Sequence, residues 1–371
     1  MKKQRIVVKV GTSVLTNETA RLNRQRMLEL VRDLACVRSA GHEVVLVTSG
    51  AQGAGREVLN YPDMTKTVTS KQILCAVGQS RLMRIYGDLF DIFQLVVGQI
   101  LLTRDDLSHR TRYLNARDTM LNLLEFGVIP IVNENDTTAT HELRVGDNDN
   151  LSALIANLID ADLLIILTDQ PGLFTSDPRK DENAQLIPLV ERIDENTMRI
   201  AGGTGTNLGT GGMATKIEAA KLATNSGVTT IIARGKEQNV VTRIVEGESI
   251  GTRFEPQVDQ LESRKRWLLA EKPRGMIYVD EGAARALVTG GVSLLAVGVV
   301  RVEGNFERGA LVAVLDSEAH KLAHGLASYN ADDLRAIGRQ KSNRIPEILG
   351  YTLGDAVIHR NNMVLLERED R

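Results

Sequence analysis

Hydrophobic and polar positions along residues 1–250 follow two alternating periods. Short apolar runs that stop at a polar residue or a glycine are typical of buried strands, and they occupy residues 5–10, 43–50, 128–136, 162–170 and 229–235. Residues 24–41 instead carry apolar side chains at helical spacing and end at Gly41, which predicts a helix. Strands that alternate with helices predict right-handed crossovers and a mainly parallel sheet covered on both faces.

Two clusters of acid and amide side chains interrupt this apolar pattern. Residues 132–137, VNENDT, end one predicted strand, and residues 145–150, VGDNDN, stand directly ahead of an apolar run. In an open sheet of this class, ligands bind beyond the carboxyl ends of the strands. The two clusters therefore predict a site at that edge of the sheet for a small polar molecule.

The pattern changes after residue 255. Residues 256–274 contain two prolines and a basic run, and we expect a linker there. Residues 275–371 hold short apolar runs separated by turns with glycine and asparagine, which predicts a small, mostly β domain of the barrel or sandwich type. We therefore expect an α/β domain at residues 1–255 and a second domain at 275–371, as a length of 371 residues also suggests.

Charge and composition argue against several kinds of partner. The formal net charge is −2, and residues 275–371 hold 11 basic and 13 acidic residues, so no electrostatic footprint for a nucleic acid is evident. No apolar run approaches the ~18–20 residues of a membrane span. Cys36 and Cys75 have no metal-ligand spacing and no disulfide framework around them. These features predict a cytoplasmic protein.

Two glycine segments are suited to binding anions. Lys9 and Gly11 end the first predicted strand, although a lysine beside a turn glycine is a weak signal in itself. Residues 207–223 place three glycines ahead of an amphipathic helix with Lys216 in its first turns, and a helix N-terminus with a lysine attracts phosphate. The segment fits neither a Walker A loop nor a dinucleotide motif, and composition alone leaves a flexible loop before a helix equally open.

The sequence matches no nucleophile or metal motif. Ser49 follows a predicted strand, but Val47 stands where a nucleophile elbow needs its first glycine, so binding or helix capping is the better interpretation. His320 and His324 are four residues apart within a β-type pattern and do not match HExxH, which favours a structural role.

Several of these segments together resemble a known family. VVKVGTSVL, VTSGAQGAGRE, PIVNENDT, VGDNDNLSALIA and GTGGMATKIEAA occur in this order within residues 5–255, and they are similar to the motifs of the amino acid kinase family. The tail resembles a PUA domain, which some members carry after the kinase domain. The resemblance implies an αβα sandwich around a mainly parallel sheet, followed by a small PUA-like domain.

Within that family, the chain resembles the members that use ATP and Mg²⁺ to phosphorylate the γ-carboxylate of L-glutamate, the first step towards proline. The product would be L-glutamyl 5-phosphate. A glutamate side chain has a pKa of ~4.3, so the acceptor is ionised at neutral pH and needs no general base. Positioning and charge neutralisation would then carry the catalysis. The resemblance further implies inhibition by proline, a homodimer or homotetramer, and glutamyl phosphate reductase as a possible partner.

The resemblance also assigns residues to the phosphoryl group and the nucleotide. Lys9 and Lys216 would clamp the transferred phosphoryl group, and Asp149 would position both lysines. The nucleotide residues that it implies are Lys9, Thr168, Asp169, Thr210, Gly211, Gly212, Met213, Ala214, Thr215 and Lys216. No metal ligand is assigned.

A second set of residues is assigned to the glutamate acceptor. Asp136 and Asp147 would bind its ammonium group, Ser49 and Asn148 its α-carboxylate, and Asn133 would align it. Which substrate group each residue of 147–149 contacts stays open. One carboxylate there could instead act through a metal-bound water.

Several alternatives remain beside this interpretation. N-acetylglutamate kinase, aspartokinase and uridylate kinase belong to the same family, but the KFGGTS start and tandem regulatory domains of aspartokinase are missing. An N-acetylated substrate has no ammonium group for the acidic clusters to bind. An RNA-binding role for the tail is disfavoured by its near-neutral charge, and a pseudokinase sensor is disfavoured because Lys9, Lys216 and Asp149 are intact.

Overall fold

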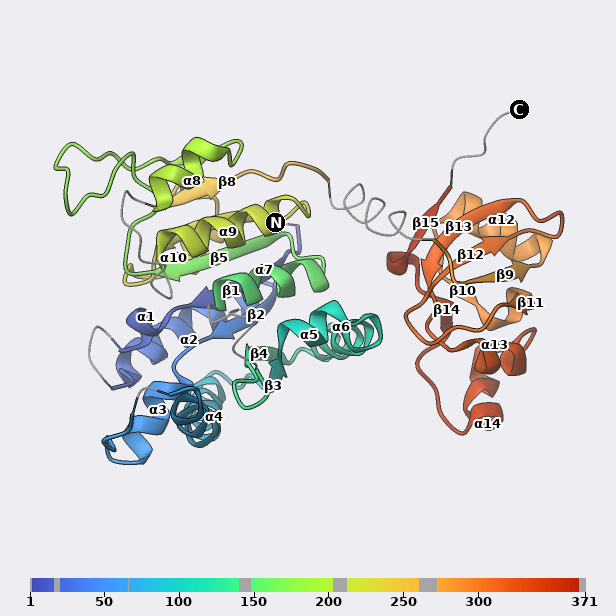
Figure 1. The fold of residues 1–371 in the computed structure, drawn as a ribbon, viewed down its shortest axis with the longest axis horizontal. Helices are drawn as coiled ribbons and strands as arrows, with labels where there is room; N and C mark the ends of the chain where they lie inside the picture. Colours follow the sequence, from blue (N-terminus) through green and yellow to red (C-terminus); the bar gives the residue numbers. More distant parts are fainter. Residues whose placement is uncertain are drawn as a thin grey trace. The chain divides into compact units, whose positions relative to one another are not determined.

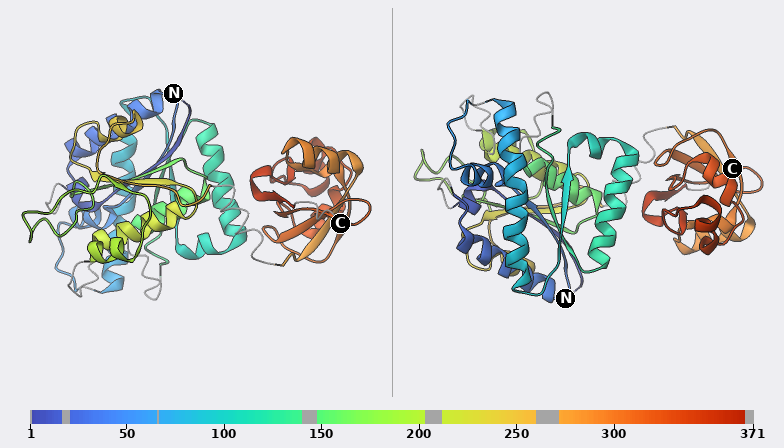
Figure 2. Two further views of the ribbon diagram at one scale, coloured as in Figure 1. Left: turned by 90° about the horizontal axis from the view of Figure 1, so that it is seen from above. Right: turned by 90° about the horizontal axis from the view of Figure 1, so that it is seen from below.

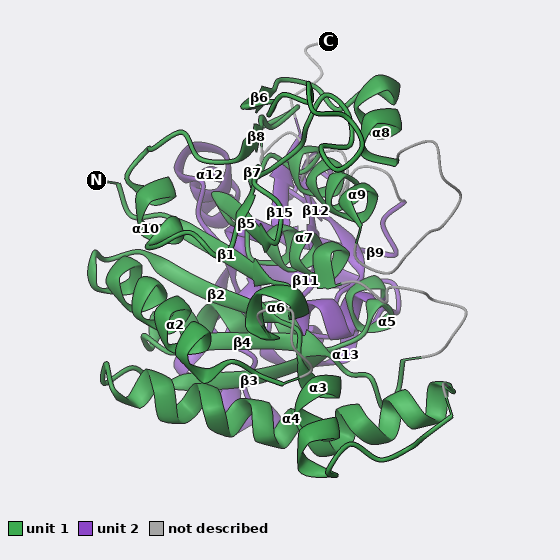
Figure 3. Ribbon diagram, turned by 90° about the vertical axis from the view of Figure 1, so that its left-hand side faces the viewer, with its two compact units in different colours: residues 1–108, 116–260 green, residues 109–115, 261–371 purple. Residues whose placement is uncertain are grey.

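The computed structural model describes residues 2–16, 21–65, 67–139, 148–202, 212–259 and 272–366. The chain divides into two compact units, which Figure 3 shows in different colours. Unit 1 comprises residues 1–108 and 116–260, and unit 2 comprises residues 109–115 and 261–371. Each unit is described by itself below.

An eight-stranded sheet of described residues forms the centre of unit 1, in the strand order β3-β4-β2-β1-β5-β7-β8-β6. All neighbours in this order are parallel except β7 and β8, which run antiparallel. The strands are β1 (Arg5–Val10), β2 (Glu43–Thr48), β3 (Val97–Leu102), β4 (Ile129–Glu134), β5 (Leu163–Thr168), β6 (Leu189–Val190), β7 (Thr229–Arg234) and β8 (Thr252–Phe254).

Helices cover both faces of this sheet (Figures 1 and 2). α7 and α9 contact β1, β5 and β7 on one face, and α2 and α4 contact β2 and β3 on the other. The helices of this part of the chain are α1 (Thr12–Thr16), α2 (Arg24–Ser39), α3 (Ala51–Val58), α4 (Val68–Asp91), α5 (Arg104–Ser108), α6 (Arg110–Glu125), α7 (Asn148–Leu158), α8 (Glu195–Gly202), α9 (Met213–Thr224) and α10 (Val240–Val245). None of the described helices combines the length and the apolar character that crossing a bilayer requires.

The α/β prediction is confirmed, with a mainly parallel sheet between two helical layers. The five predicted strands are present as β1, β2, β4, β5 and β7, and the predicted helix is α2. Asn23 begins α2, where its side chain accepts a hydrogen bond from the N–H of Arg26, the usual device for satisfying a free N–H at a helix start. Strands β3, β6 and β8 were not predicted.

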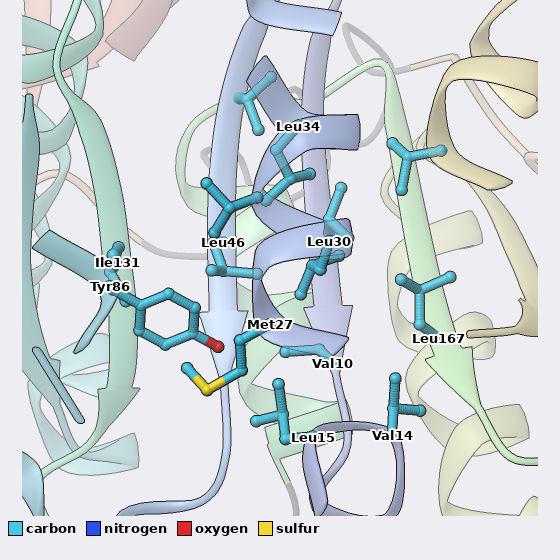
Figure 4. Packing of buried hydrophobic residues seen from close by; sticks show 14 of the residues in the cluster. Val10, Val14, Leu15, Met27, Leu30, Leu34, Leu46, Tyr86, Ile131 and Leu167 are labelled. Carbon is cyan, nitrogen blue, oxygen red and sulfur yellow. The ribbon is translucent and has the colours of Figure 1, made fainter. Parts of the chain in front are cut away.

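Alternation along β1 decides which side chains face the core and which face the site. Val10 lies in a buried cluster with Leu46 of β2, Met27 of α2 and Tyr86 of α4 (Figure 4). Because successive side chains of a strand point to opposite faces, Lys9 points to the other face, which α7 and α9 cover.

Unit 2 contains a five-stranded sheet of order β11-β9-β12-β13-β15 and a separate pair, β10 and β14. The prediction of a mostly β tail is confirmed, but short helices that it did not anticipate lie between the strands. The elements are β9 (Gly275–Val279), α12 (Glu281–Gly290), β10 (Leu294–Leu295), η1 (Ala296–Gly298), β11 (Val299–Glu303), β12 (Leu311–Leu315), β13 (Lys321–Leu326), α13 (Ala331–Ile337), η2 (Ser342–Arg344), α14 (Ile345–Leu349), β14 (Ala356–Ile358), η3 (Arg360–Asn362) and β15 (Met363–Leu365).

Candidate active site

A buried carboxylate joins two lysines that are far apart in the sequence. Asp149 lies in the first turn of α7 and is fully buried. Its Oδ1 pairs with the Nζ of Lys9, and its Oδ2 lies 3.1 Å from the Nζ of Lys216. The hydroxyl of Thr215 also donates to Oδ2, at 3.1 Å. The structure therefore brings the three residues assigned to catalysis into one cluster.

Two buried ammonium groups share one carboxylate in this cluster. Lys9 is 3% exposed and Lys216 is 5% exposed, so water screens neither ammonium group well. Asp149 holds the two ammonium groups side by side. Two neighbouring ammonium groups are suited to an anion with more than one oxygen, such as a phosphoryl group.

The start of α9 adds hydrogen-bond donors next to Lys216. Gly212 is the residue before the helix and provides no side-chain cap for the N–H groups of the first turn. Unpaired N–H groups and the helix dipole favour an anion at such an end. Met213, Ala214 and Thr215 form this first turn. Thr210 and Gly211, which were also assigned to the nucleotide, lie outside the described residues.

Amide side chains cluster at the ends of β2 and β4. The Nδ2 of Asn148 lies 2.6 Å from the main-chain oxygen of Thr48, 2.9 Å from the Oδ1 of Asn133 and 3.1 Å from the Oγ of Ser49. Asn133 in turn donates from its Nδ2 to the Oε1 of Gln79, at 2.9 Å. Three residues assigned to the acceptor are thus in contact, and Gln79 joins them from α4 without having been predicted.

The acidic end of β4 is paired with a lysine that sequence analysis missed. Lys71 of α4 places its Nζ 3.0 Å from the Oδ1 of Asp136, the predicted ligand of the substrate ammonium. Burial, together with the charge of Asp136, raises the pKa of Glu134 to about 7. The same two causes raise the pKa of the Cys75 thiol to about 12. Asp147, the second predicted ammonium ligand, lies outside the described residues.

Two predicted nucleotide residues, Thr168 and Asp169, lie at the end of β5. Thr168 ends β5 and donates from its hydroxyl to the Oδ1 of Asp169, at 2.9 Å. The N–H of Gly235 donates to the main-chain oxygen of Thr168 at 2.7 Å, and the Nε of Arg234 donates to the main-chain oxygen of Asp169 at 3.1 Å. These bonds fix Thr168 and Asp169 at the carboxyl edge of the sheet, on the strand next to β1.

The described residues do not form a protein cage for Mg²⁺. No group of three or more His, Cys, Asp or Glu side chains is arranged around a common point in the described ranges. The one carboxylate between the lysines, Asp149, already has both oxygens engaged. Mg²⁺ is commonly held by substrate phosphates with only one or two protein carboxylates, so the donor set fits an ion that arrives with a nucleotide better than a resident one.

Comparison with known sequences identifies the family of the chain. The profile of the amino acid kinase family matches residues 4–234. The chain belongs to this family. The profile of the PUA domain matches residues 275–349. The family resemblance predicted from the motifs is confirmed, and the protein is a kinase.

Curated relatives match over nearly the whole chain. The protein named "Glutamate 5-kinase" from Sodalis glossinidius is 51% identical over 98% of this chain and 99% of its own length. Its namesake from Herpetosiphon aurantiacus is 54% identical over 97% of this chain and 98% of its own length. Its namesake from Deinococcus radiodurans is 51% identical over 98% of this chain and 100% of its own length.

Proposed function

We propose that this protein transfers the γ-phosphoryl group of ATP to the γ-carboxylate of L-glutamate, which gives L-glutamyl 5-phosphate as the first step of proline biosynthesis. The observation that carries the proposal is the buried cluster of Lys9, Asp149 and Lys216, because two ammonium groups held side by side suit a phosphoryl group between two anions. Relatives named "Glutamate 5-kinase", at 51–54% identity over nearly full length, support the same substrate.

The chemistry needs positioning more than proton transfer. The γ-carboxylate is ionised at neutral pH, so its oxygen can attack the γ-phosphorus of ATP without a base. The bond from that phosphorus to the bridging oxygen breaks, and ADP leaves. Lys9 and Lys216 neutralise charge on the transferred group, and Asp149 holds both ammonium groups in place. Charge-stabilising groups that are already in position lower the barrier without reorganising during the reaction.

The acceptor residues surround the ends of β2 and β4. We assign Ser49, Asn133 and Asn148 to the bound amino acid and Asp136 to its ammonium group, which would replace Lys71 as the ion partner of Asp136. Asp147 keeps its predicted role as a second ammonium ligand.

We assign Thr168, Asp169 and residues 210–216 to ATP, with Mg²⁺ entering as its complex. We further propose a kinase domain at residues 1–255, a linker at 256–274 and a PUA-like domain at 275–371. The proposal also includes four properties of the protein: inhibition by proline at the glutamate site, assembly into a homodimer or homotetramer, a cytoplasmic location, and transfer of the product to glutamyl phosphate reductase. The location follows from composition and cysteine usage, and the other three follow from the family resemblance.

The decisive experiment traps the acyl phosphate. Purified protein with ATP, Mg²⁺, L-glutamate and hydroxylamine should yield γ-glutamyl hydroxamate, and reactions with N-acetylglutamate and L-aspartate should yield none. Hydroxamate from N-acetylglutamate alone would overturn the assignment of Asp136 to an ammonium group. An absence of hydroxamate with every acceptor would overturn the proposed reaction.

A pair of lysine variants tests the charge argument in the same assay. Lys216→Ala should lower kcat on the order of 100-fold or more, with a smaller change in the KM for glutamate, because it removes a cation from the transferred group. Lys221→Ala changes an exposed lysine in the last turn of the same helix and should leave kcat unchanged. A Lys216→Ala protein with near-normal kcat would remove this lysine from the transition state.

A further inference from the structure

Three side-chain amides form a continuous hydrogen-bonded chain across unit 1. Gln79 of α4 accepts from Asn133 of β4, and Asn133 accepts from Asn148 at the start of α7. The chain ends at the main-chain oxygen of Thr48, which lies 2.6 Å from the Nδ2 of Asn148. Sequence analysis identified Asn133 and Asn148, but the chain also requires Gln79.

The direction of every amide in this chain follows from one carbonyl group. The oxygen of Thr48 can only accept, so the atom of Asn148 beside it must be the Nδ2 donor. That nitrogen also faces Asn133, whose nearer atom must then be Oδ1, and this leaves the Nδ2 of Asn133 to donate to Gln79. Amide orientation is usually an assignment made from the network, and here the network permits one orientation.

The orientation of the Asn148 amide determines which of its two polar atoms is available to a ligand. Its Nδ2 is occupied by protein acceptors, while its Oδ1 has no hydrogen bond with any described residue. A free carbonyl oxygen accepts hydrogen bonds and repels a carboxylate. Asn148 is therefore suited to the ammonium group of an amino acid, and this changes its predicted role as a ligand of the α-carboxylate.

Gln79 lies at the end of the amide chain opposite Thr48, where its Oε1 accepts the hydrogen bond from Asn133. Its Nε2 is buried and has no partner among the described residues, an unfavourable arrangement that packing alone does not explain. Lys71 lies two helical turns earlier on the same face of α4 and reaches Asp136. One face of α4 therefore contacts both the amide chain and the carboxylate at the end of β4.

We propose that Gln79 is a positioning residue, which fixes the amide of Asn133 and through it the oxygen of Asn148 for the substrate ammonium. The inference rests on the proposed function, because that function supplies the ammonium group. Gln79 acts at a distance from the phosphoryl group. It should therefore affect binding of the amino acid more than the transfer step.

Two substitutions at Gln79 separate this role from a structural one. Gln79→Met keeps the length of the side chain and removes the acceptor, whereas Gln79→Glu keeps an acceptor oxygen. Gln79→Met should raise the KM for L-glutamate roughly three- to tenfold, the range expected for one lost neutral hydrogen bond, with kcat and the KM for ATP within about twofold of wild type. Gln79→Glu should restore most of the KM. Ser80→Ala, an exposed neighbour on α4, should match wild type.

Glutarate serves as a further test ligand, because it has both carboxylates of L-glutamate but no ammonium group. Its inhibition constant against L-glutamate should change less than about twofold in Gln79→Met, since the missing interaction is with the ammonium. A Gln79→Met protein with a wild-type KM for L-glutamate would overturn the inference. A general impairment would also overturn it: a lower kcat, a higher KM for both substrates and weaker glutarate binding, none of which Gln79→Glu restores. A wild-type protein that forms no glutamyl hydroxamate would overturn the proposed function itself, and the positioning role with it.

Discussion

Glu134 ends β4 beside Asp136, and its partly buried carboxyl makes stability depend on pH. Burial first, and the charge of Asp136 second, raise its pKa from 4.5 to about 7. Between these values the folded protein keeps a proton that the unfolded chain has lost. The free energy of unfolding due to this group therefore falls as pH rises from about 4.5 to 7 and stays constant above that range. Glu134→Gln should remove this fall. The free energy of unfolding of the variant minus that of wild type should therefore be larger at pH 8 than at pH 5.

Urea unfolding of both proteins at several pH values measures this difference directly. Glu182→Gln is the control, because Glu182 is exposed in the described part of the chain and its variant should follow the wild-type curve at every pH. If the difference between Glu134→Gln and wild type is the same at pH 5 and pH 8, Glu134 does not titrate in this window.

At the scale of single residues, sequence analysis found the types of side chain in the site but not their partners. Asp149, Asn148 and Lys216 stand in motifs whose composition already suggests a polar ligand. Lys71 and Gln79 do not, because they lie in a long helix whose other positions are largely apolar or solvent-facing. Their spacing of eight residues places them on one face of a helix, but only the fold shows that this face lies against the end of β4.

At the scale of elements, continuous apolar runs predicted the buried strands well because a parallel strand covered on both faces needs apolar side chains at nearly every position. All six residues of β2 and of β5 are buried. The three-residue strand β8 has no such run. In the tail, Asp280 directly precedes α12, and its side chain accepts a hydrogen bond from the N–H of Ala283. The β-type runs around it obscured this start signal.

The crossing of α3 and α4 depends on glycine. A Cβ atom at Gly78 of α4 would lie 1.8 Å from the main-chain oxygen of Ala51 in α3, and backbone on both sides leaves no flexible group to move aside. Gly78→Ala should therefore lower the free energy of unfolding by roughly 2–4 kcal/mol, because it forces the two helices apart. The KM for glutamate should also rise, since α3 begins directly after Ser49 and Gly50.

Gly87 provides a matched control on the same helix. A Cβ atom there meets no other atom within 4 Å, so Gly87→Ala should be neutral or stabilising by up to about 1 kcal/mol through helix propensity alone. Urea unfolding of the two variants compares them under one protocol. Equal stability of Gly78→Ala and Gly87→Ala would show that the helices can separate at little cost.

At the scale of the whole molecule, the site gathers residues 9, 149 and 216, which no local pattern links. Their meeting follows from topology, because β1 and β5 are neighbouring parallel strands and α7 and α9 pack against each other on one face of the sheet. Crossovers of one handedness make such a convergence at the carboxyl edge predictable. The hydrogen bonds within the site could not be predicted, because they depend on ångström-scale distances that the topology does not determine.

Removal of residues 275–371 tests how far the site depends on the tail. The ion pairs of the lysine cluster and the hydrogen bonds of the amide chain given above join residues between 9 and 216. The truncated protein should therefore still form γ-glutamyl hydroxamate, with kcat within about tenfold of full length. Residues 109–115 belong to unit 2 and stay behind, so a lower unfolding temperature is expected. Truncated Lys216→Ala is the low-activity control. A truncated protein that keeps its circular dichroism spectrum but loses all transfer would place part of the active machinery in the tail.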